Sequence, residues 1–312
     1  MIQNEVPSID MAPFLLGSAP ARLAVANQMG RACQEIGFLS ITGHAMPESL
    51  IQEMSAMSRR FFDLPLEEKM RAPINRHGSG YVPIKAEALA ASLGQKTPGD
   101  LKESFNAGRD FDANPWPPAL PELREVWQRY FTRLNALGAE IMRMFALGLD
   151  LPERFFDGKI DPPQSFLRAI NYPEQAEAPL PDQLRAGAHS DYGTLTILLS
   201  ENKPGGLQVR ARNGEWVNVI SPPGAFVINI GDMMQRWTND RWMSTVHRVV
   251  NPPGDARGSR RQSLVFFHSP NENALIEPLE TCVSVDNLAR YEPILSGEHM
   301  RRKSEQAGTL AK

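Results

Sequence analysis

The chain has 312 residues, of which 42% are hydrophobic, and its formal net charge is −3. This length suits one large domain or two ordinary ones, and the apolar content is enough for a sizeable core. The weak negative charge argues against nucleic acid or an anionic membrane as the main partner. No apolar run approaches the length of a transmembrane helix.

Two features indicate the compartment. The stretch from Met1 to Pro7 lacks a basic region followed by an apolar one, which argues against a secretory leader. Cys33 and Cys282 are the two cysteines, and neither belongs to a CxxC arrangement. Buried free thiols in a reducing environment are therefore expected rather than a disulfide framework. We expect a cytoplasmic protein.

The first third of the chain alternates short strands with helices. Strands are expected over residues 6–10 and 37–43, and apolar spacing predicts helices over 22–36 and from Pro47 to about residue 63. Residues 72–118 are rich in Gly and Pro and hold few periodic apolar runs. We expect them to form a long irregular loop over a functional site.

A long helix is predicted over residues 120–149, where one apolar stripe forms a packing surface. Beyond it, strands are expected over 165–172, 194–199, 207–212, 215–220, 225–230, 246–250 and 263–267. Asn213 and Gly214, between two of these strands, predict a hairpin.

No helix of comparable length separates these strands, which favours an antiparallel barrel or jelly roll over βαβ units. The expected fold is thus mainly β with supporting helices. Residues 1–118 are expected to form an N-terminal region, and residues 119–312 a jelly-roll core with a C-terminal tail. We expect the two parts to make one structural unit.

His189 and Asp191 stand two positions apart, just before an apolar segment. On a strand, such residues point the same way, so both side chains could reach one point. A histidine with a carboxylate is two thirds of the facial triad that holds non-haem Fe(II). His247, on a later predicted strand, is the candidate third ligand. The alternative is that His189 and Asp191 form a satisfied core pair in a non-catalytic jelly-roll binding protein.

Arg261 and Ser263 are also two positions apart, on an otherwise apolar strand. An arginine directed into an apolar barrel needs an anion, because an unpaired buried charge is costly. A planar guanidinium beside a hydroxyl suits a carboxylate held at two points. The alternative is that Arg261 points outward, as an ordinary surface charge beside Arg260.

Several segments, in their order and spacing, are similar to one known family. They are residues 6–10, 32–38, 61–65, 171–173, 189–191, 223–232, 247–249 and 261–263. On these segments the chain resembles, over nearly its whole length, the Fe(II)- and 2-oxoglutarate-dependent dioxygenases of the isopenicillin N synthase-like family. The resemblance implies a double-stranded β-helix, a jelly roll, with helices packed on it. It also implies that His189, Asp191 and His247 bind Fe(II).

The resemblance further implies that Arg261 and Ser263 bind the distal carboxylate of 2-oxoglutarate, whose keto acid end chelates the iron. Tyr172 falls where the family commonly has a tyrosine near this co-substrate. Many members have an asparagine two residues earlier, where this chain has Ile170, while Asn171 is the immediate neighbour. Either Tyr172 or Asn171 is therefore expected to contact co-substrate. The remaining iron position is left for O₂.

The implied reaction oxidises, most often hydroxylates, a C–H bond of a small organic metabolite and releases succinate and CO₂. Isopenicillin N synthase and aminocyclopropane carboxylate oxidase offer an alternative on the same scaffold, because they do not use 2-oxoglutarate. Tyr81, Phe105, Asn106 and Trp237 are candidates for substrate contact.

Three further expectations concern the surface. Lys102 and Glu103 are expected to be solvated. The C-terminal stretch from Asp286 to Lys303 ends in three basic residues, which suits a frayed helix end, and the resemblance implies that such a tail can close over the site. A monomer or weak homo-oligomer is expected.

Overall fold

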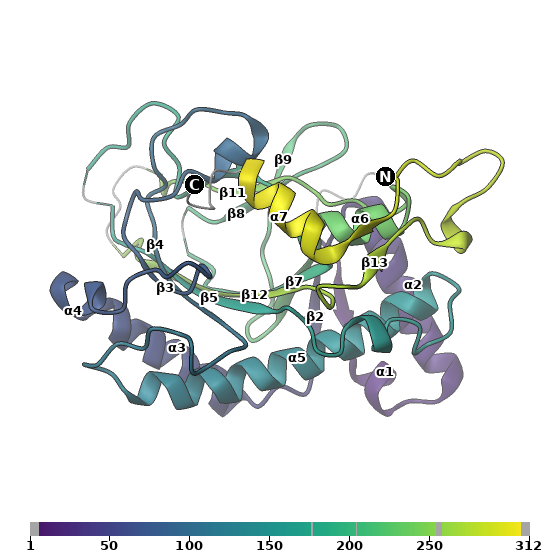
Figure 1. The fold of residues 1–312 in the computed structure, drawn as a ribbon, viewed down its shortest axis with the longest axis horizontal. Coiled ribbons are helices and arrows are strands. Elements are labelled where there is room, and N and C mark those ends of the chain that lie inside the picture. The colour runs from purple at the N-terminus through teal and green to yellow at the C-terminus, as the bar shows by residue number, and fades with distance from the viewer. Residues whose placement is uncertain (1–5, 176, 204, 254–257, 307–312) are drawn as a thin grey trace.

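A computed structural model describes residues 6–175, 177–203, 205–253 and 258–306. Within them, a larger sheet has the strand order β1-β2-β10-β7-β12-β5-β4-β3, and a smaller sheet has the order β6-β11-β8-β9. The larger sheet lies between the smaller sheet and a layer of helices (Figure 1). Apart from the parallel pair β1–β2, the neighbours in both sheets are antiparallel. The predicted jelly roll with supporting helices is confirmed.

The elements have the following bounds. The larger sheet consists of β1 (Ser8–Asp10), β2 (Phe38–Thr42), β3 (Gly80–Val82), β4 (Glu103–Gly108), β5 (Phe166–Tyr172), β7 (Leu195–Ser200), β10 (Phe226–Ile230) and β12 (Arg261–His268). The smaller sheet consists of β6 (Ala186–His189), β8 (Leu207–Arg210), β9 (Trp216–Asn218) and β11 (His247–Val249). The α-helices are α1 (Ala12–Leu16), α2 (Ala19–Glu35), α3 (Glu48–Phe62), α4 (Leu66–Met70), α5 (Glu122–Gly148), α6 (Asp232–Trp237) and α7 (Ser296–Gln306). The chain also forms a 3₁₀ helix, η1 (Leu89–Leu93), and a small ribbon of β13 (Leu275–Ile276) and β14 (Ile294–Leu295).

The two faces of the larger sheet bury different cores. Helix α5 lies along the outer face, and its apolar stripe, including Leu134 and Ile141, joins one core with Phe266 of β12. The inner face forms a second core with the smaller sheet, to which Val265 of β12 and Val249 of β11 belong. Because side chains alternate along a strand, the neighbours Val265 and Phe266 enter different cores.

The expectation that residues 72–118 form one irregular loop is wrong. This segment contains β3 and β4, which extend the larger sheet at its edge beyond β5. The pairing is long-range, since Glu103 lies opposite Asn171 and Gly108 opposite Phe166. The Gly and Pro residues around these strands obscured the period-2 pattern on which a sequence-based prediction depends.

Lys102 and Glu103 are buried rather than solvated, since they are 3% and 8% exposed. Lys102 pairs with Glu87, and the Glu103 carboxylate accepts a bond of 2.8 Å from Lys69 Nζ. Both charges can be buried because each has an opposite charge in contact. Among the described residues, no helix has the length and apolar character to cross a membrane.

Candidate metal centre

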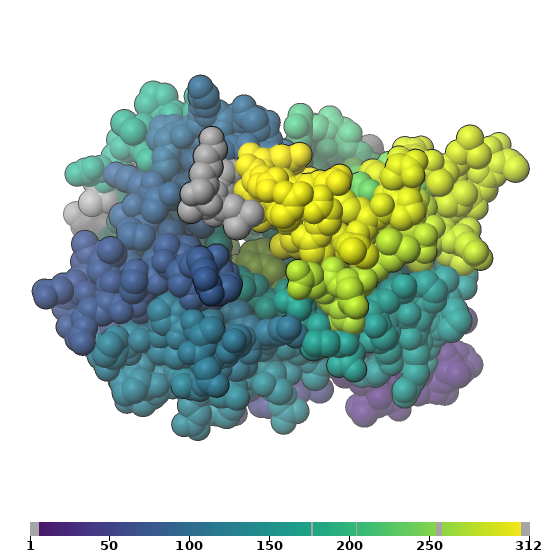
Figure 2. Space-filling view, in the orientation of Figure 1, coloured from purple at the N-terminus to yellow at the C-terminus, as the bar shows by residue number. Residues whose placement is uncertain are grey.

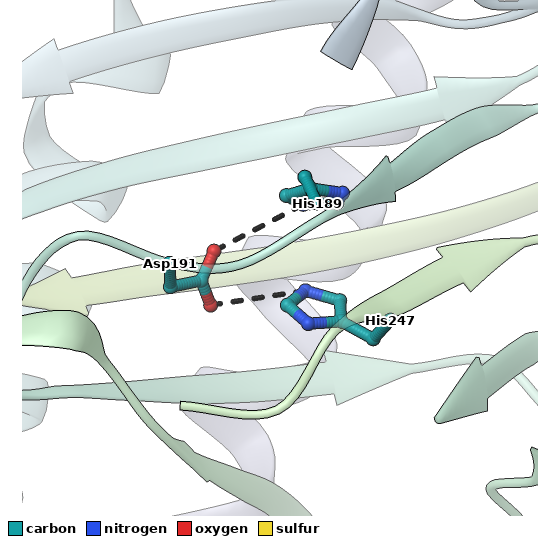
Figure 3. Close-up of side chains that lie close together, drawn as sticks. All are labelled: His189, Asp191 and His247. Atoms are coloured by element: carbon teal, nitrogen blue, oxygen red, sulfur yellow. Dashed lines mark ion pairs between the residues drawn. The ribbon is translucent and has the colours of Figure 1, made fainter. Parts of the chain in front are cut away.

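Three predicted ligands come together at one end of the smaller sheet. His189 is the last residue of β6 and His247 the first of β11, and the two residues lie opposite each other in the antiparallel pair. Asp191 lies beyond the end of β6, in the turn to β7, so the expectation that it shares a strand with His189 is wrong. The three side chains nevertheless point toward one another (Figure 3).

The spacing of the donor atoms suits a divalent ion. His189 Nε2 lies 3.9 Å from Asp191 Oδ1, and His247 Nε2 lies 3.9 Å from Asp191 Oδ2. One possible ligand atom from each residue lies within 4.8 Å of the other two. Donors about 2.1 Å from one metal ion lie about 3 Å apart when they are adjacent in its coordination sphere, so small movements of these side chains bring them to bonding distance. Two imidazoles and one carboxylate form the facial set that suits Fe(II), so the residues fit the metal.

Backbone carbonyls orient both imidazoles. His189 Nδ1 lies 2.8 Å from the Gly187 carbonyl oxygen, and His247 Nδ1 lies 3.1 Å from the Thr245 carbonyl oxygen. A proton on each Nδ1 satisfies these contacts and leaves Nε2 with a free lone pair toward Asp191. The rings lie with centroids 4.3 Å apart.

The carboxylate of Asp191 is held by two side chains from the larger sheet. Thr196 Oγ1 and Asn229 Nδ2 both donate to Asp191 Oδ2, at 2.6 and 2.7 Å. Sequence reasoning missed both residues. Asn229 did carry an indication, because it is the one polar side chain in the strand Phe226–Ile230 and a buried amide there needs a partner.

Burial and neighbouring groups set the protonation of the site. Burial, followed by the proximity of His247, lowers the pKa of His189 to about 3. Burial alone would raise the pKa of Asp191, but His247, His189 and the bonds from Thr196 and Asn229 outweigh it and hold the pKa below its usual value. A neutral His189 and an ionised Asp191 are the states that bind a metal ion.

Arg261 lies on the inner face of β12, and the alternative that it is a surface charge is wrong because it is only 2% exposed. Its Nε donates to the Glu201 carbonyl oxygen at 3.0 Å, and its Nη2 donates to Ser200 Oγ. Its Nη1 is buried and has no hydrogen-bond partner among the described residues. A buried guanidinium with a free donor fits an anionic group such as the 2-oxoglutarate carboxylate.

Ser263 shares the buried inner face with Arg261, and its Oγ lies 3.4 Å from Ser200 Oγ. Tyr172 lies opposite Arg261 in the β5–β12 pair, and the guanidinium carbon is 5.1 Å from the centre of its ring. Asn171 faces the other side of the sheet, where its Nδ2 donates to Glu103 and its Oδ1 accepts from Arg260. Of the two candidates for co-substrate contact, the geometry therefore supports Tyr172, and the expectation for Asn171 is corrected.

The structure places the four candidates for substrate contact in different surroundings. Phe105 packs in the outer core between Phe61 and Trp127, and Tyr81 on the same face donates a bond of 2.5 Å to Glu103. The expectation that Phe105 and Tyr81 contact substrate is wrong. The even-numbered positions of β4 face the barrel, whereas Phe105, and Tyr81 opposite it on β3, face the helices.

Trp237 of α6 is 1% exposed, packs against Phe156 and donates its indole N–H to the Leu275 carbonyl oxygen. The expectation that it contacts substrate is also corrected, because packing accounts for its whole surface. Asn106 is the one candidate of the four on the inner face of the larger sheet, opposite Arg168.

Comparisons with known proteins agree with this geometry. Residues 6–126 match the family model of the non-haem dioxygenase in morphine synthesis N-terminal region, and residues 163–270 match that of the 2OG-Fe(II) oxygenase superfamily. The chain is 31% identical to the 2-oxoglutarate-Fe(II) type oxidoreductase hxnY of Emericella nidulans, covering 98% of this chain and 91% of the relative. It is 30% identical to a homoarginine-6-hydroxylase of Glycine max, covering 96% of each.

Solved structures give the same result. A full-length Neurospora crassa protein in complex with alpha-KG and thymine superimposes with a TM-score of 0.87, at 30% identity over 97% of each chain. A putative 2OG-Fe(II) oxygenase family protein from Caulobacter crescentus gives a TM-score of 0.84, at 30% identity over 96% of this chain and 98% of that one. The chain therefore belongs to the 2OG-Fe(II) oxygenase superfamily and is a 2-oxoglutarate-dependent dioxygenase that uses Fe(II) and O₂.

Proposed function

We propose that this dioxygenase hydroxylates a C–H bond of a small organic metabolite and converts 2-oxoglutarate to succinate and CO₂. The observation that carries the proposal is the free Nη1 of Arg261, buried on the inner face beside Tyr172 in a barrel that also carries the metal triad. Relatives named as hydroxylases, and neighbours solved with small molecules such as thymine, support this reaction and this class of substrate. The relatives are named as 2-oxoglutarate enzymes, which gives the 2-oxoglutarate-independent alternative no support.

The residues of the chain have separate tasks in this reaction. Bound iron, with 2-oxoglutarate and O₂, supplies the oxidising power. Arg261, through its free Nη1, and the neighbouring Ser263 hydroxyl hold the distal carboxylate of the co-substrate at two points and so orient it. Thr196 and Asn229 keep Asp191 in position. Apolar side chains between the sheets, including Val209, exclude water from the reacting centre.

The first test is anaerobic reconstitution with Fe(II), followed by addition of 2-oxoglutarate. We expect a weak visible charge-transfer band from the chelate. Arg261→Lys keeps the charge but loses the fork of donors, so we expect at least tenfold weaker 2-oxoglutarate binding in a titration of this band. Arg260→Lys is the matched control, because Arg260 bonds Asn171 and Asp63 on the outer face.

Two results would contradict the proposal. If iron binds but no band forms, the enzyme does not chelate 2-oxoglutarate and the isopenicillin N synthase type of chemistry replaces it. If Arg261→Lys binds 2-oxoglutarate as the unmodified enzyme does, the carboxylate is held elsewhere. If the band forms and Arg261→Lys weakens 2-oxoglutarate binding, release of succinate measured across a set of small metabolites identifies the substrate.

A further inference from the structure

The inner face of the larger sheet carries a group of polar side chains that the metal and co-substrate do not use. Ser104 and Asn106 stand two positions apart on β4, and Arg168 of β5 lies directly opposite Asn106. Ile170, which lies opposite Ser104, belongs to the core between the two sheets. Because side chains on one face of neighbouring strands share a direction, Ser104, Asn106 and Arg168 project into the barrel.

Each of these three side chains has a buried polar atom without a hydrogen-bond partner among the described residues. These atoms are Ser104 Oγ, Asn106 Oδ1 and Arg168 Nε. Buried polar groups are normally paired, and each exception needs an explanation. Single unpaired atoms occur elsewhere, such as Ser58 Oγ on α3, but here three gather on one face inside the barrel. Such a cluster points to a ligand.

The rest of this polar group is fixed in place. Arg168 Nη1 and Nη2 donate to the two oxygens of Glu87 at 3.2 and 3.3 Å, and Asn106 Nδ2 donates to the Gly78 carbonyl oxygen at 3.2 Å. Glu87 also pairs with Lys102. Burial raises the pKa of Glu87, but Arg168 and Lys102 outweigh it and lower the pKa to about 2. The unpaired atoms of Asn106 and Arg168 therefore keep their positions. Two cations, Arg168 and Lys102, share the single anion Glu87.

The group lies within reach of the metal centre. Asn106, Arg168, Val265 and Leu198 follow one another across β4, β5, β12 and β7, and Thr196, two residues from Leu198, bonds Asp191. Three strand spacings of about 4.8 Å make roughly 14 Å along the sheet, and side chains project from both ends of this span. A small metabolite held by this polar group therefore lies within reach of the metal centre.

The strand that carries His189 is also tied to the segment that enters β4. Gly187 N donates to Asp100 Oδ1 at 3.0 Å, which fixes β6 beside this polar group. In Figure 2 the surface is hollowed between helix α7, in yellow, and the blue part of the chain that includes β3 and β4. Ser104 and Asn106 belong to β4, so we expect a ligand to approach them from this hollow.

We propose that Ser104, Asn106 and Arg168 bind the polar end of the primary substrate and determine its class. Arg168 Nε offers a donor, Asn106 Oδ1 an acceptor, and Ser104 Oγ serves as either. Their complement is a carbonyl oxygen next to an N–H, as on the edge of a cyclic amide or imide. The excess of positive charge favours a neutral or anionic ligand over a cation. This inference rests on the proposed function, because it places the ligand beside iron and co-substrate.

The experiment is anaerobic calorimetry on the enzyme loaded with Fe(II) and 2-oxoglutarate, with binding as the readout. The probes are uracil, 2-piperidone and succinimide, with 1,3-dimethyluracil as the analogue without N–H and arginine as a cation. We expect at least one of the three cyclic amides or imides to bind, and dimethyluracil and arginine to bind at least tenfold more weakly. Ser104→Ala and Asn106→Ala should each weaken binding at least fivefold. Ser58→Ala makes the same change at an unpaired buried serine on α3 and should leave binding unaltered.

The visible band distinguishes failure of this inference from failure of the proposed function. If the band forms and none of the three cyclic probes binds, the assigned substrate class is wrong while the proposed function stands. If a probe binds equally well to Ser104→Ala, Asn106→Ala and the unmodified enzyme, these residues do not recognise it. If the band itself does not form, the proposed function fails and this inference fails with it.

Discussion

Asn229 is a polar residue in an apolar strand, and its Nδ2 donates to the Asp191 carboxylate at 2.7 Å. Removing the amide in Asn229→Ala frees Asp191 to rotate away from the two imidazoles. Residues that orient metal ligands typically contribute 10–100-fold to affinity, so we expect an Fe(II) dissociation constant about 10–100-fold higher, measured by anaerobic titration.

Asn202→Ala is the matched control, because Asn202 Nδ2 donates to the Ser221 carbonyl oxygen and not to a ligand. Its iron affinity should equal that of the unmodified enzyme. An unchanged iron affinity in Asn229→Ala would show that Thr196 alone is sufficient to orient Asp191.

His268, at the end of β12, gives the protein a pH-dependent stability. Burial lowers its pKa to about 4, whereas the unfolded chain has an imidazole pKa of about 6.5. Between these values the unfolded state takes up a proton that the folded state does not. The free energy of unfolding therefore falls as the pH drops below about 6.5, by up to about 1.4 kcal/mol per pH unit from this group.

His268→Gln removes this proton uptake. We expect the variant to lose less stability than the unmodified protein when urea unfolding is compared at pH 7 and pH 5. Equal losses in the two proteins would mean that protonation of His268 is not coupled to unfolding.

The sequence predicted single residues where their chemistry is distinctive. His189, Asp191, His247 and Arg261 are residue types with few roles in a β-barrel, and all four lie in the barrel. Whether Tyr172 or Asn171 lies beside Arg261 depends on which face of β5 points inward. A shift of one residue reverses that face, and the sequence alone does not fix it.

At the scale of elements, one buried carboxylate joins four segments of the chain. Glu103 of β4 accepts bonds from Lys69 of α4, Tyr81 of β3 and Asn171 of β5. Lys69 and Glu103 have side chains only 10% and 9% exposed. Glu103→Ala leaves the Lys69 charge buried without its partner, which typically costs about 3–5 kcal/mol, and urea unfolding should show a loss of this order.

Glu53→Ala makes the same change in an exposed pair with Arg129, where the side chains are 43% and 46% exposed. Its loss should be below about 1 kcal/mol. A loss of similar size in both variants would show that the Glu103 network adds nothing beyond an ordinary surface ion pair.

Elements with a strong local period were predicted well. The long helix expected over 120–149 is Glu122–Gly148, and the hairpin at Asn213 and Gly214 joins β8 to β9. Strands β3 and β4 were missed because they are short and take their stability from partners far along the chain. Local sequence carries little information about such pairing.

At the scale of the molecule, the N-terminal region supplies both ends of the larger sheet. Strands β1 and β2 extend it beyond β10, and β4 and β3 extend it beyond β5. We propose that the regions 1–118 and 119–312 form one cooperative unit. A fragment of residues 119–312 would expose the edges of β10 and β5, and exposed edges promote aggregation.

We therefore expect this fragment to be recovered as aggregate, and the whole chain to unfold in one transition when followed by both circular dichroism and tryptophan fluorescence. A soluble, monomeric fragment with a cooperative melting transition would show instead that the core folds independently. Size-exclusion chromatography of the freshly refolded fragment distinguishes the two outcomes.

The same strand order determines when each strand can pair during synthesis of the chain. Phe38 of β2 pairs with Asn229 of β10, so the first strands emerge from the ribosome long before their partners. At about 5–20 residues per second, the intervening stretch of roughly 190 residues takes about 10–40 s to make. For that time the nascent N-terminal third has open strand edges, and the emergence of β10 determines when β1 and β2 can enter the sheet.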